Sequence, residues 1–135
     1  MKILKKLFAS KEVKAALGVL DELEYTCDSY AFQLVRKQVE SAILENPQKF
    51  IRAIEKQNRT PRQKVYSMLE HVAGDYLECG SHDFYVYRGL LTPAGEDLLR
   101  AYDVIIDRMK EIDYVSNERV AKQKSDIRER IKEAY

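Results

Sequence analysis

One stretch of the sequence, CGSHDFYVYRGLLTPAG at residues 79–95, gathers side chains that could do chemistry between two strongly helical segments. Its candidate recognition residues are His82, Asp83, Tyr85, Tyr87 and Arg88. Tyrosine and arginine are enriched among the residues that dominate binding energy at protein interfaces. The stretch therefore predicts an ordered recognition loop at residues 82–88. A purely structural role, in which the same side chains pack and hydrogen-bond within the loop, is the alternative.

The sequence of this loop also suggests how it would lie. Phe84-Tyr85-Val86-Tyr87 has high β-propensity, but no second strand is evident and a lone strand is not stable. We therefore predict an extended aromatic loop over about residues 80–91. Side chains alternate between two faces of extended backbone, so Phe84 and Val86 would anchor the loop while Tyr85 and Tyr87 face solvent.

Residues for nucleophilic catalysis are present but incomplete. Cys79 and His82 could form a nucleophile and its base, or half of a zinc site, but no second ligand pair accompanies them. Two groups three residues apart across a glycine are also poorly placed to act on one another. An enzyme with a site at His82, Asp83, Tyr85 and Arg88 is therefore an alternative function rather than the main prediction.

A stripe of potential metal ligands runs along the helix that precedes the loop, and a later helix adds two carboxylates. These residues are His71, Asp75, Glu78 and His82, with Asp103 and Asp107. The stripe lies away from the apolar face of its helix, and Gly80 is a natural helix end that precedes His82. We therefore expect a polar face, with no metal and no cofactor.

A basic cluster around residues 52–64 gives a second alternative. Its cations are Arg52, Lys56, Arg59, Arg62 and Lys64. A turn between two helices that carries such residues could contact phosphates of a nucleic acid. However, the following segment becomes apolar, which leaves few side chains to reach base edges. The net charge of the whole chain is only +1, so it creates no general attraction to nucleic acid.

Helical signals dominate the rest of the chain. Each proline follows a capping residue, in Asn46-Pro47, Thr60-Pro61 and Thr92-Pro93, and proline is favoured at the first position of a helix. Ser10 is expected to cap an earlier helix, and Asp28 or Thr26 the next one. Apolar residues recur at helical spacing in every segment between these signals. The pattern predicts a bundle of five to six helices, the fifth running from Pro93 to about Val115.

The last helix, within residues 116–135, has a thinner apolar stripe. Val120, Ile127 and Ile131 form the stripe, and Lys124 interrupts it. Such a helix either lies along the edge of the bundle or packs on a partner. We therefore expect residues 116–135 to pack weakly on the bundle and to offer a second binding surface.

Length and composition limit the class of protein. The 135 residues, with 45% apolar and 33% charged side chains, predict a single helical domain spanning residues 1–135. Two cysteines are too few for a disulfide framework, and no stretch approaches the ~20 apolar residues of a membrane span. Residues 1–10 form a short basic amphipathic segment that is expected to dock on the bundle or fray.

These observations together predict an all-α, single-domain bundle with one extended aromatic loop, in a cytoplasmic protein. Its expected function is interaction with a protein partner or with itself, through residues 82–88 and the last helix.

Overall fold

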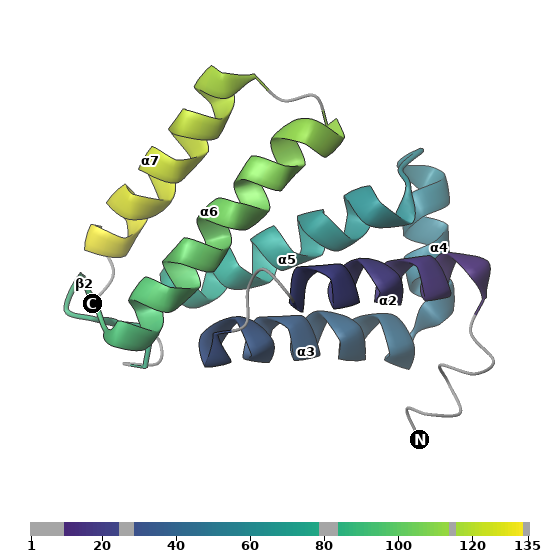
Figure 1. Ribbon diagram of the computed structural model, residues 1–135, viewed down its shortest axis with the longest axis horizontal. Helices are drawn as coiled ribbons and strands as arrows, with labels where there is room; N and C mark the ends of the chain where they lie inside the picture. Colours follow the sequence, from purple (N-terminus) through teal and green to yellow (C-terminus); the bar gives the residue numbers. More distant parts are fainter. Residues whose placement is uncertain (1–9, 25–28, 79–83, 114–115, 134–135) are drawn as a thin grey trace.

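The computed structural model describes residues 10–24, 29–78, 84–113 and 116–133, which form six helices and one small hairpin (Figure 1). The helices are α2 (Lys11–Glu24), α3 (Tyr30–Glu45), α4 (Pro47–Lys56), α5 (Pro61–Glu78), α6 (Pro93–Asp113) and α7 (Asn117–Glu133). The strands β1 (Val86–Tyr87) and β2 (Leu90–Leu91) join α5 to α6. The predicted all-α bundle is confirmed. None of these helices combines the length and apolar character that a bilayer span requires.

Two of the proline helices illustrate how the sequence sets helix boundaries. Asn46 caps α4, and its Oδ1 accepts a hydrogen bond from the backbone N–H of Lys49 at 3.2 Å. Thr60 and Gln63 form a reciprocal pair at the start of α5, because each side chain accepts from the backbone N–H of the other, at 3.2 and 2.9 Å. These caps satisfy amides that have no partner inside the helix.

Serine residues cap two further helices. Ser10 caps α2, as predicted, by accepting from the amide three residues further along the chain at 3.3 Å. The prediction that Asp28 or Thr26 caps α3 is wrong, because Ser29 accepts from the backbone N–H of Phe32 at 3.2 Å. Asp28 and Thr26 themselves lie outside the described residues, as do residues 1–9.

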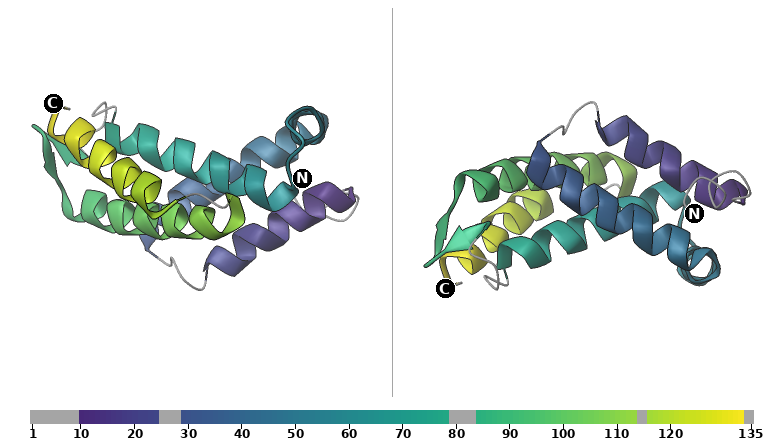
Figure 2. Two further views of the ribbon diagram at one scale, coloured as in Figure 1. Left: turned by 90° about the horizontal axis from the view of Figure 1, so that it is seen from above. Right: turned by 90° about the horizontal axis from the view of Figure 1, so that it is seen from below.

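The core is built around the pair α5 and α6, which connect the two ends of the molecule. Helices α3 and α7 lie on opposite sides of this pair, each in contact with both of its members (Figure 2). Helix α2 packs on α5, α3 and α4. The largest side chains that are completely buried include Leu20, Phe32, Tyr66, Leu69, Leu98 and Ile105.

Helix α7 packs on the bundle through the predicted thin stripe. Val120, Ile127 and Ile131 are all buried. Three cations of α7 pair with carboxylates of its neighbours: Arg128 with Asp103 at 2.6 Å, Lys124 with Asp107 at 2.7 Å, and Arg130 with Glu78 at 2.6 Å. The stripe therefore faces the bundle of its own chain and is not an open surface.

Candidate interaction surface

The aromatic segment between α5 and α6 is a β-hairpin. Val86 pairs with Leu91 and Tyr87 pairs with Leu90 in an antiparallel ladder. The two turn residues, Arg88 and Gly89, have φ values of 52° and 76°. Positive φ at both positions of a two-residue turn matches the type I′ geometry that suits the twist of a hairpin. The prediction of an extended segment without a partner strand is therefore wrong, because Leu90–Leu91 supplies that strand.

The predicted facing of the aromatic residues is correct for β1 and wrong for the two residues before it. Val86 is buried and Tyr87 is 49% exposed, as alternation along a strand requires. Phe84, however, is 46% exposed, whereas Tyr85 is only 5% exposed. The alternation fails there because Phe84 and Tyr85 form a turn that precedes the strand. His82 and Asp83 lie outside the described residues.

Tyr85 anchors the hairpin through its aromatic ring. The ring stacks on Tyr76 of α5, with 5.4 Å between centroids and 9° between planes. The Phe84 ring meets it edge-on at 4.8 Å. Burial raises the pKa of the Tyr85 hydroxyl, and the neighbouring hydroxyls of Tyr76 and Tyr30 raise this pKa further. The ring contacts therefore make Tyr85 an anchor of the hairpin on α5.

Thr92 joins the backbone of the hairpin to the start of α6. Its Oγ1 donates to the backbone carbonyls of Phe84 and Tyr85, and the distance to the Tyr85 oxygen is 3.0 Å. The Thr92 Oγ1 also accepts a hydrogen bond from the backbone N–H of Gly95 at 3.1 Å, and this bond caps α6. The backbone N–H of Thr92 also donates to the Tyr85 carbonyl at 3.0 Å. These bonds fix the hairpin relative to α6.

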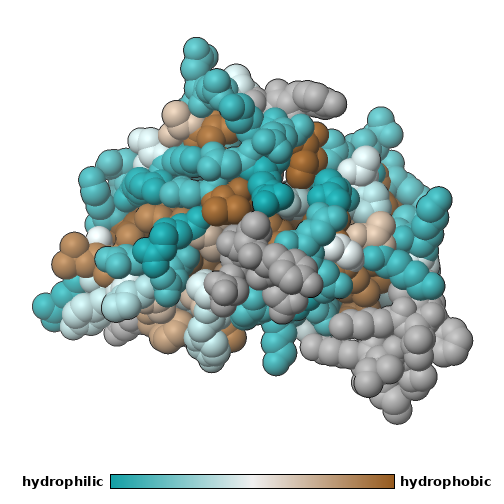
Figure 3. All heavy atoms as spheres, in the orientation of Figure 1, coloured by the Kyte–Doolittle hydropathy of each residue, from teal (hydrophilic) through white to brown (hydrophobic). Residues whose placement is uncertain are grey.

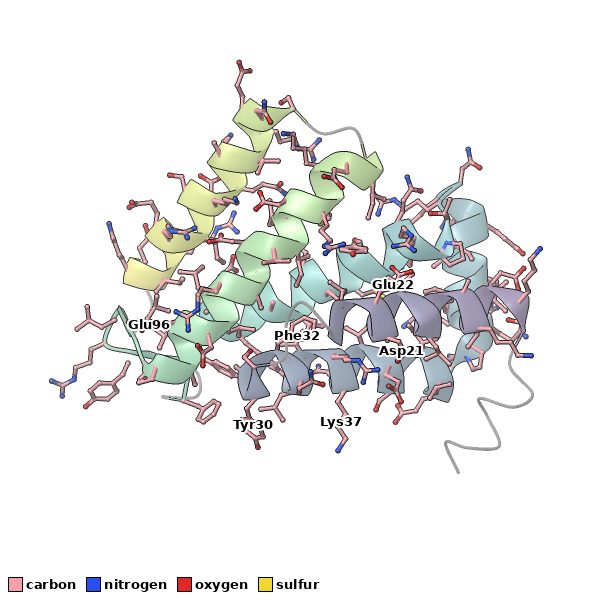
Figure 4. The ribbon with its side chains drawn as sticks, in the orientation of Figure 1. Asp21, Glu22, Tyr30, Phe32, Lys37 and Glu96 are labelled. Atoms are coloured by element: carbon pink, nitrogen blue, oxygen red, sulfur yellow. The ribbon has the colours of Figure 1, made fainter. Side chains whose placement is uncertain are left out.

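The exposed large apolar side chains of the described residues gather at this end of the molecule. We call them the hairpin surface: Tyr30, Phe84, Tyr87 and Leu90. Leu90 and Tyr30 are 73% and 71% exposed. Tyr30 projects outward from the start of α3 (Figure 4), and apolar atoms are visible in Figure 3 at the end where β2 lies. Helix α7 also contacts β2, so the two predicted binding elements adjoin.

A cation lies beside this apolar group. The Arg88 guanidinium is 5.3 Å from the centroid of the Tyr87 ring, which is a cation–π contact. Arg88 is exposed and, within the described part of the chain, pairs with no carboxylate. Of the predicted recognition residues that the structure describes, Tyr87 and Arg88 therefore present their side chains to solvent, whereas Tyr85 is buried.

The potential metal ligands do not converge in the described structure. His71 and Asp75 are 3.4 Å apart on α5, and both side chains are exposed. Glu78, Asp103 and Asp107 are instead occupied by the cations of α7. Within the ranges that the structure describes, no three His, Cys, Asp or Glu side chains are close enough to hold a metal ion.

Four of the five basic residues of the 52–64 region have different surroundings in the structure. Arg62 makes a two-bond ion pair with Glu22 of α2, at 2.8 and 2.9 Å, which raises the Arg62 pKa and lowers the Glu22 pKa. The Arg52 Nε donates to the Gln48 carbonyl of its own helix at 3.3 Å. Arg59 lines a pocket against α6 and α7, whereas Lys64 lines a different one between α3, α4 and α5.

Two residues of the hairpin surface, Tyr30 and Leu90, were not among the recognition residues predicted from the sequence. Tyr30 is exposed beside the hairpin although it belongs to the start of α3, and Leu90 lies beyond the turn. The dipeptide Leu90-Leu91 just before Thr92-Pro93 was the available signal for a second strand. Comparison with known proteins adds no assignment: no protein-family model matches the chain, and no curated protein and no solved structure is significantly similar to it.

Proposed function

We propose that this chain is a protein-interaction module that binds a segment of another protein through the hairpin surface. The observation that supports this proposal is that exposed Phe84, Tyr87 and Leu90 lie on or next to a firmly anchored hairpin, and that exposed Tyr30 of α3 lies at the same end of the molecule. Exposed apolar groups of this kind mark interaction sites, and a rigid support lowers the entropy lost on binding. The surface would contribute two or three aromatic side chains to the centre of an interface.

The size and charge of the surface favour a short segment of a different protein over a second copy of this chain. A stable interface of standard size involves about 20–30 residues from each side. Four apolar side chains form a much smaller patch, suited to a peptide or to one helix of a partner. Because Arg88 has no carboxylate partner among the described residues, the segment is expected to carry an acidic residue beside its apolar ones.

The last helix would play a smaller part than the sequence suggests. Its apolar stripe is used within the bundle, so α7 offers a partner only its polar flank next to β2. The alternative of an enzyme gains no support from Tyr85, which is buried, and its candidate residues His82 and Asp83 lie outside the described residues. The alternative of nucleic-acid binding has little support because three cations of the 52–64 region have separate surroundings. Arg62 pairs with Glu22, and Arg59 and Lys64 line two different pockets.

The decisive experiment compares partner binding by the wild-type chain and by Tyr87→Ser and Leu90→Ser. Proteins that bind the immobilised chain would be purified and tested for direct binding in solution. We expect each substitution to raise the Kd at least tenfold, or about 1.4 kcal/mol, since both remove apolar contact area. Neither should lower the melting temperature, because both side chains are exposed.

Lys37→Ser provides the matched control, since Lys37 is exposed on α3 and lies outside the hairpin surface. The proposal would be wrong if Lys37→Ser weakened binding as much as Tyr87→Ser. It would also be wrong if light scattering showed a dimer of the purified chain that Leu90→Ser converts to monomers, because the occupant would then be a second copy.

A further inference from the structure

A pocket of about 390 Å³ lies at the other end of the α5–α6 pair, away from the hairpin. Its lining residues come from the turn between α4 and α5, the first turn of α5, the last turns of α6 and the first turns of α7. Its charged lining residues are Arg59 of the α4–α5 turn, Lys110 of α6 and Arg119 of α7. Among the described residues, no acidic side chain lines the pocket. The volume is at the lower end of the range of small-molecule pockets.

These three cations differ from the other cations that lie between helices. Arg62, Lys124 and Arg128 each contact a carboxylate of a neighbouring helix. By contrast, the side chains of Arg59, Lys110 and Arg119 have no carboxylate within ion-pair distance among the residues the structure describes. Three like charges around one hollow repel one another, and a bound anion would relieve that repulsion.

The remaining lining residues are neutral and suit a polar molecule. Side-chain amides of the α4–α5 turn and of α7, such as Asn58 and Gln123, could hydrogen-bond hydroxyl groups. Ile106 and Met109 of α6 add apolar surface. The turn that carries Arg59 is fixed in place, because the Arg59 backbone N–H donates to the Ile54 carbonyl at 2.9 Å.

We infer that this pocket binds the phosphate group of a small phosphorylated molecule. Two guanidinium groups and one ammonium match the charge of a phosphate monoester or a diphosphate. Guanidinium groups bind phosphate oxygens through paired hydrogen bonds, and three positive charges together favour a multiply charged phosphate over an anion with a single charge. The amides and the apolar residues would contact the rest of the molecule. This site is separate from the hairpin surface and does not depend on the function proposed for it.

Titration calorimetry with pyrophosphate at pH 7.5 tests the inference directly. We expect Arg59→Gln and Arg119→Gln to weaken pyrophosphate binding at least tenfold, because each removes one charge and its hydrogen bonds. Lys122→Gln is the matched control, since Lys122 is exposed on the same helix as Arg119 and does not line the pocket. This control should change the Kd by less than about twofold.

A second measurement excludes unfolding as the cause of lost binding. The melting temperature of ligand-free Arg119→Gln should equal or exceed that of the wild type, because the substitution reduces repulsion in the empty pocket. Pyrophosphate should raise the melting temperature of the wild type and of Lys122→Gln only. The inference is overturned if the wild type does not bind pyrophosphate, or if Lys122→Gln loses as much affinity as Arg119→Gln.

Comparing the binding of a single-stranded oligonucleotide with that of pyrophosphate distinguishes a small-molecule pocket from an extended surface that binds nucleic acid. If a single-stranded oligonucleotide binds more tightly than pyrophosphate, and Arg52→Gln weakens it as much as Arg59→Gln, the cations act as a nucleic-acid surface. The pocket inference would then be wrong. Pyrophosphate binding that depends on Arg59 and Arg119 and not on Arg52 supports it.

Discussion

Gly95 has no room for a side chain, because a Cβ atom there would lie 1.9 Å from the carbonyl oxygen of Tyr85. That carbonyl also accepts the hydrogen bonds from Thr92, so the hairpin cannot move away without losing them. We expect Gly95→Ala to destabilise the protein by about 1–3 kcal/mol, the usual cost of overpacking a well-packed site. Urea denaturation followed by circular dichroism would measure the change in the free energy of unfolding.

Gly18 is the control for this prediction. A Cβ atom on Gly18, in the middle of α2, would meet no atom within 4 Å. Gly18→Ala should therefore stabilise the protein by about 0.5–1 kcal/mol, since alanine favours the helix and glycine does not. Equal effects of the two substitutions would contradict the role assigned to the Tyr85 contact.

At the scale of single residues, local contacts were predictable and distant ones were not. Ser10, Asn46 and Thr60 could be recognised as caps because a cap binds an amide two or three residues away. The burial of Tyr85 depends on Tyr76 of α5 and on the Thr92 and Gly95 backbone, so the local alternation of side chains gave the wrong answer for it.

Among the elements, α7 combines a narrow apolar stripe with ion pairs to α6 and α5. Ile127 is buried in that stripe, whereas the Arg128–Asp103 pair is partly exposed. We expect Ile127→Ala to cost about 2–5 kcal/mol, because it removes buried methyl groups and leaves a cavity. Arg128→Gln should cost no more than about 1 kcal/mol, since water screens an exposed pair.

Chemical denaturation of the two variants would measure both costs. If Arg128→Gln destabilised the protein more than Ile127→Ala, α7 would be held chiefly by charge, and the assignment of its thin stripe as the main contact would be wrong. The same measurement in 1 M salt should reduce the effect of Arg128→Gln and leave that of Ile127→Ala nearly unchanged.

At the scale of elements, the helices followed from the sequence, whereas their pairing did not. The three proline starts and the apolar periodicity place α4, α5 and α6 within a few residues of where they lie. The hairpin was missed because each strand has only two residues and the turn begins with Arg88 instead of the usual asparagine or glycine. No spacing rule shows that Asp103 and Asp107 meet cations of α7.

For the whole molecule, buried tyrosines predict a loss of stability in alkaline solution. Burial is the main cause that raises the pKa of Tyr66, Tyr85 and Tyr102 above the usual value near 10. Below pH 10 the folded and unfolded states are both protonated. Above it the unfolded state loses protons first, so the free energy of unfolding falls, by up to about 1.4 kcal/mol per pH unit for each tyrosine.

Tyr102→Phe tests this prediction. Tyr102 is buried and its hydroxyl donates to Glu70 at 3.1 Å, so the substitution should cost about 1 kcal/mol at pH 7. Between pH 10 and 11.5 the variant should lose stability less steeply than the wild type, as measured by urea denaturation across the pH series. Identical slopes would show that Tyr102 ionises as easily in the folded protein as in the unfolded chain.

The two candidate sites could not be assembled from the sequence, because each depends on how distant segments meet. The hairpin surface joins Tyr30 of α3 to residues of β1 and β2. The pocket joins Arg59, Lys110 and Arg119, and in the sequence only Arg59 belongs to the basic 52–64 cluster. A basic pocket of this kind is a property of the packed bundle.

Helix α6 leaves the hairpin at Pro93 and reaches the pocket at Lys110, a path of about 25 Å along its axis. The Debye length at physiological ionic strength is about 8 Å. An anion held in the pocket would therefore leave the electrostatic potential at Arg88 almost unchanged. The affinity for a protein partner at the hairpin and the affinity for a small molecule in the pocket should therefore be independent of one another. Coupling between the two sites would require a movement of the helices.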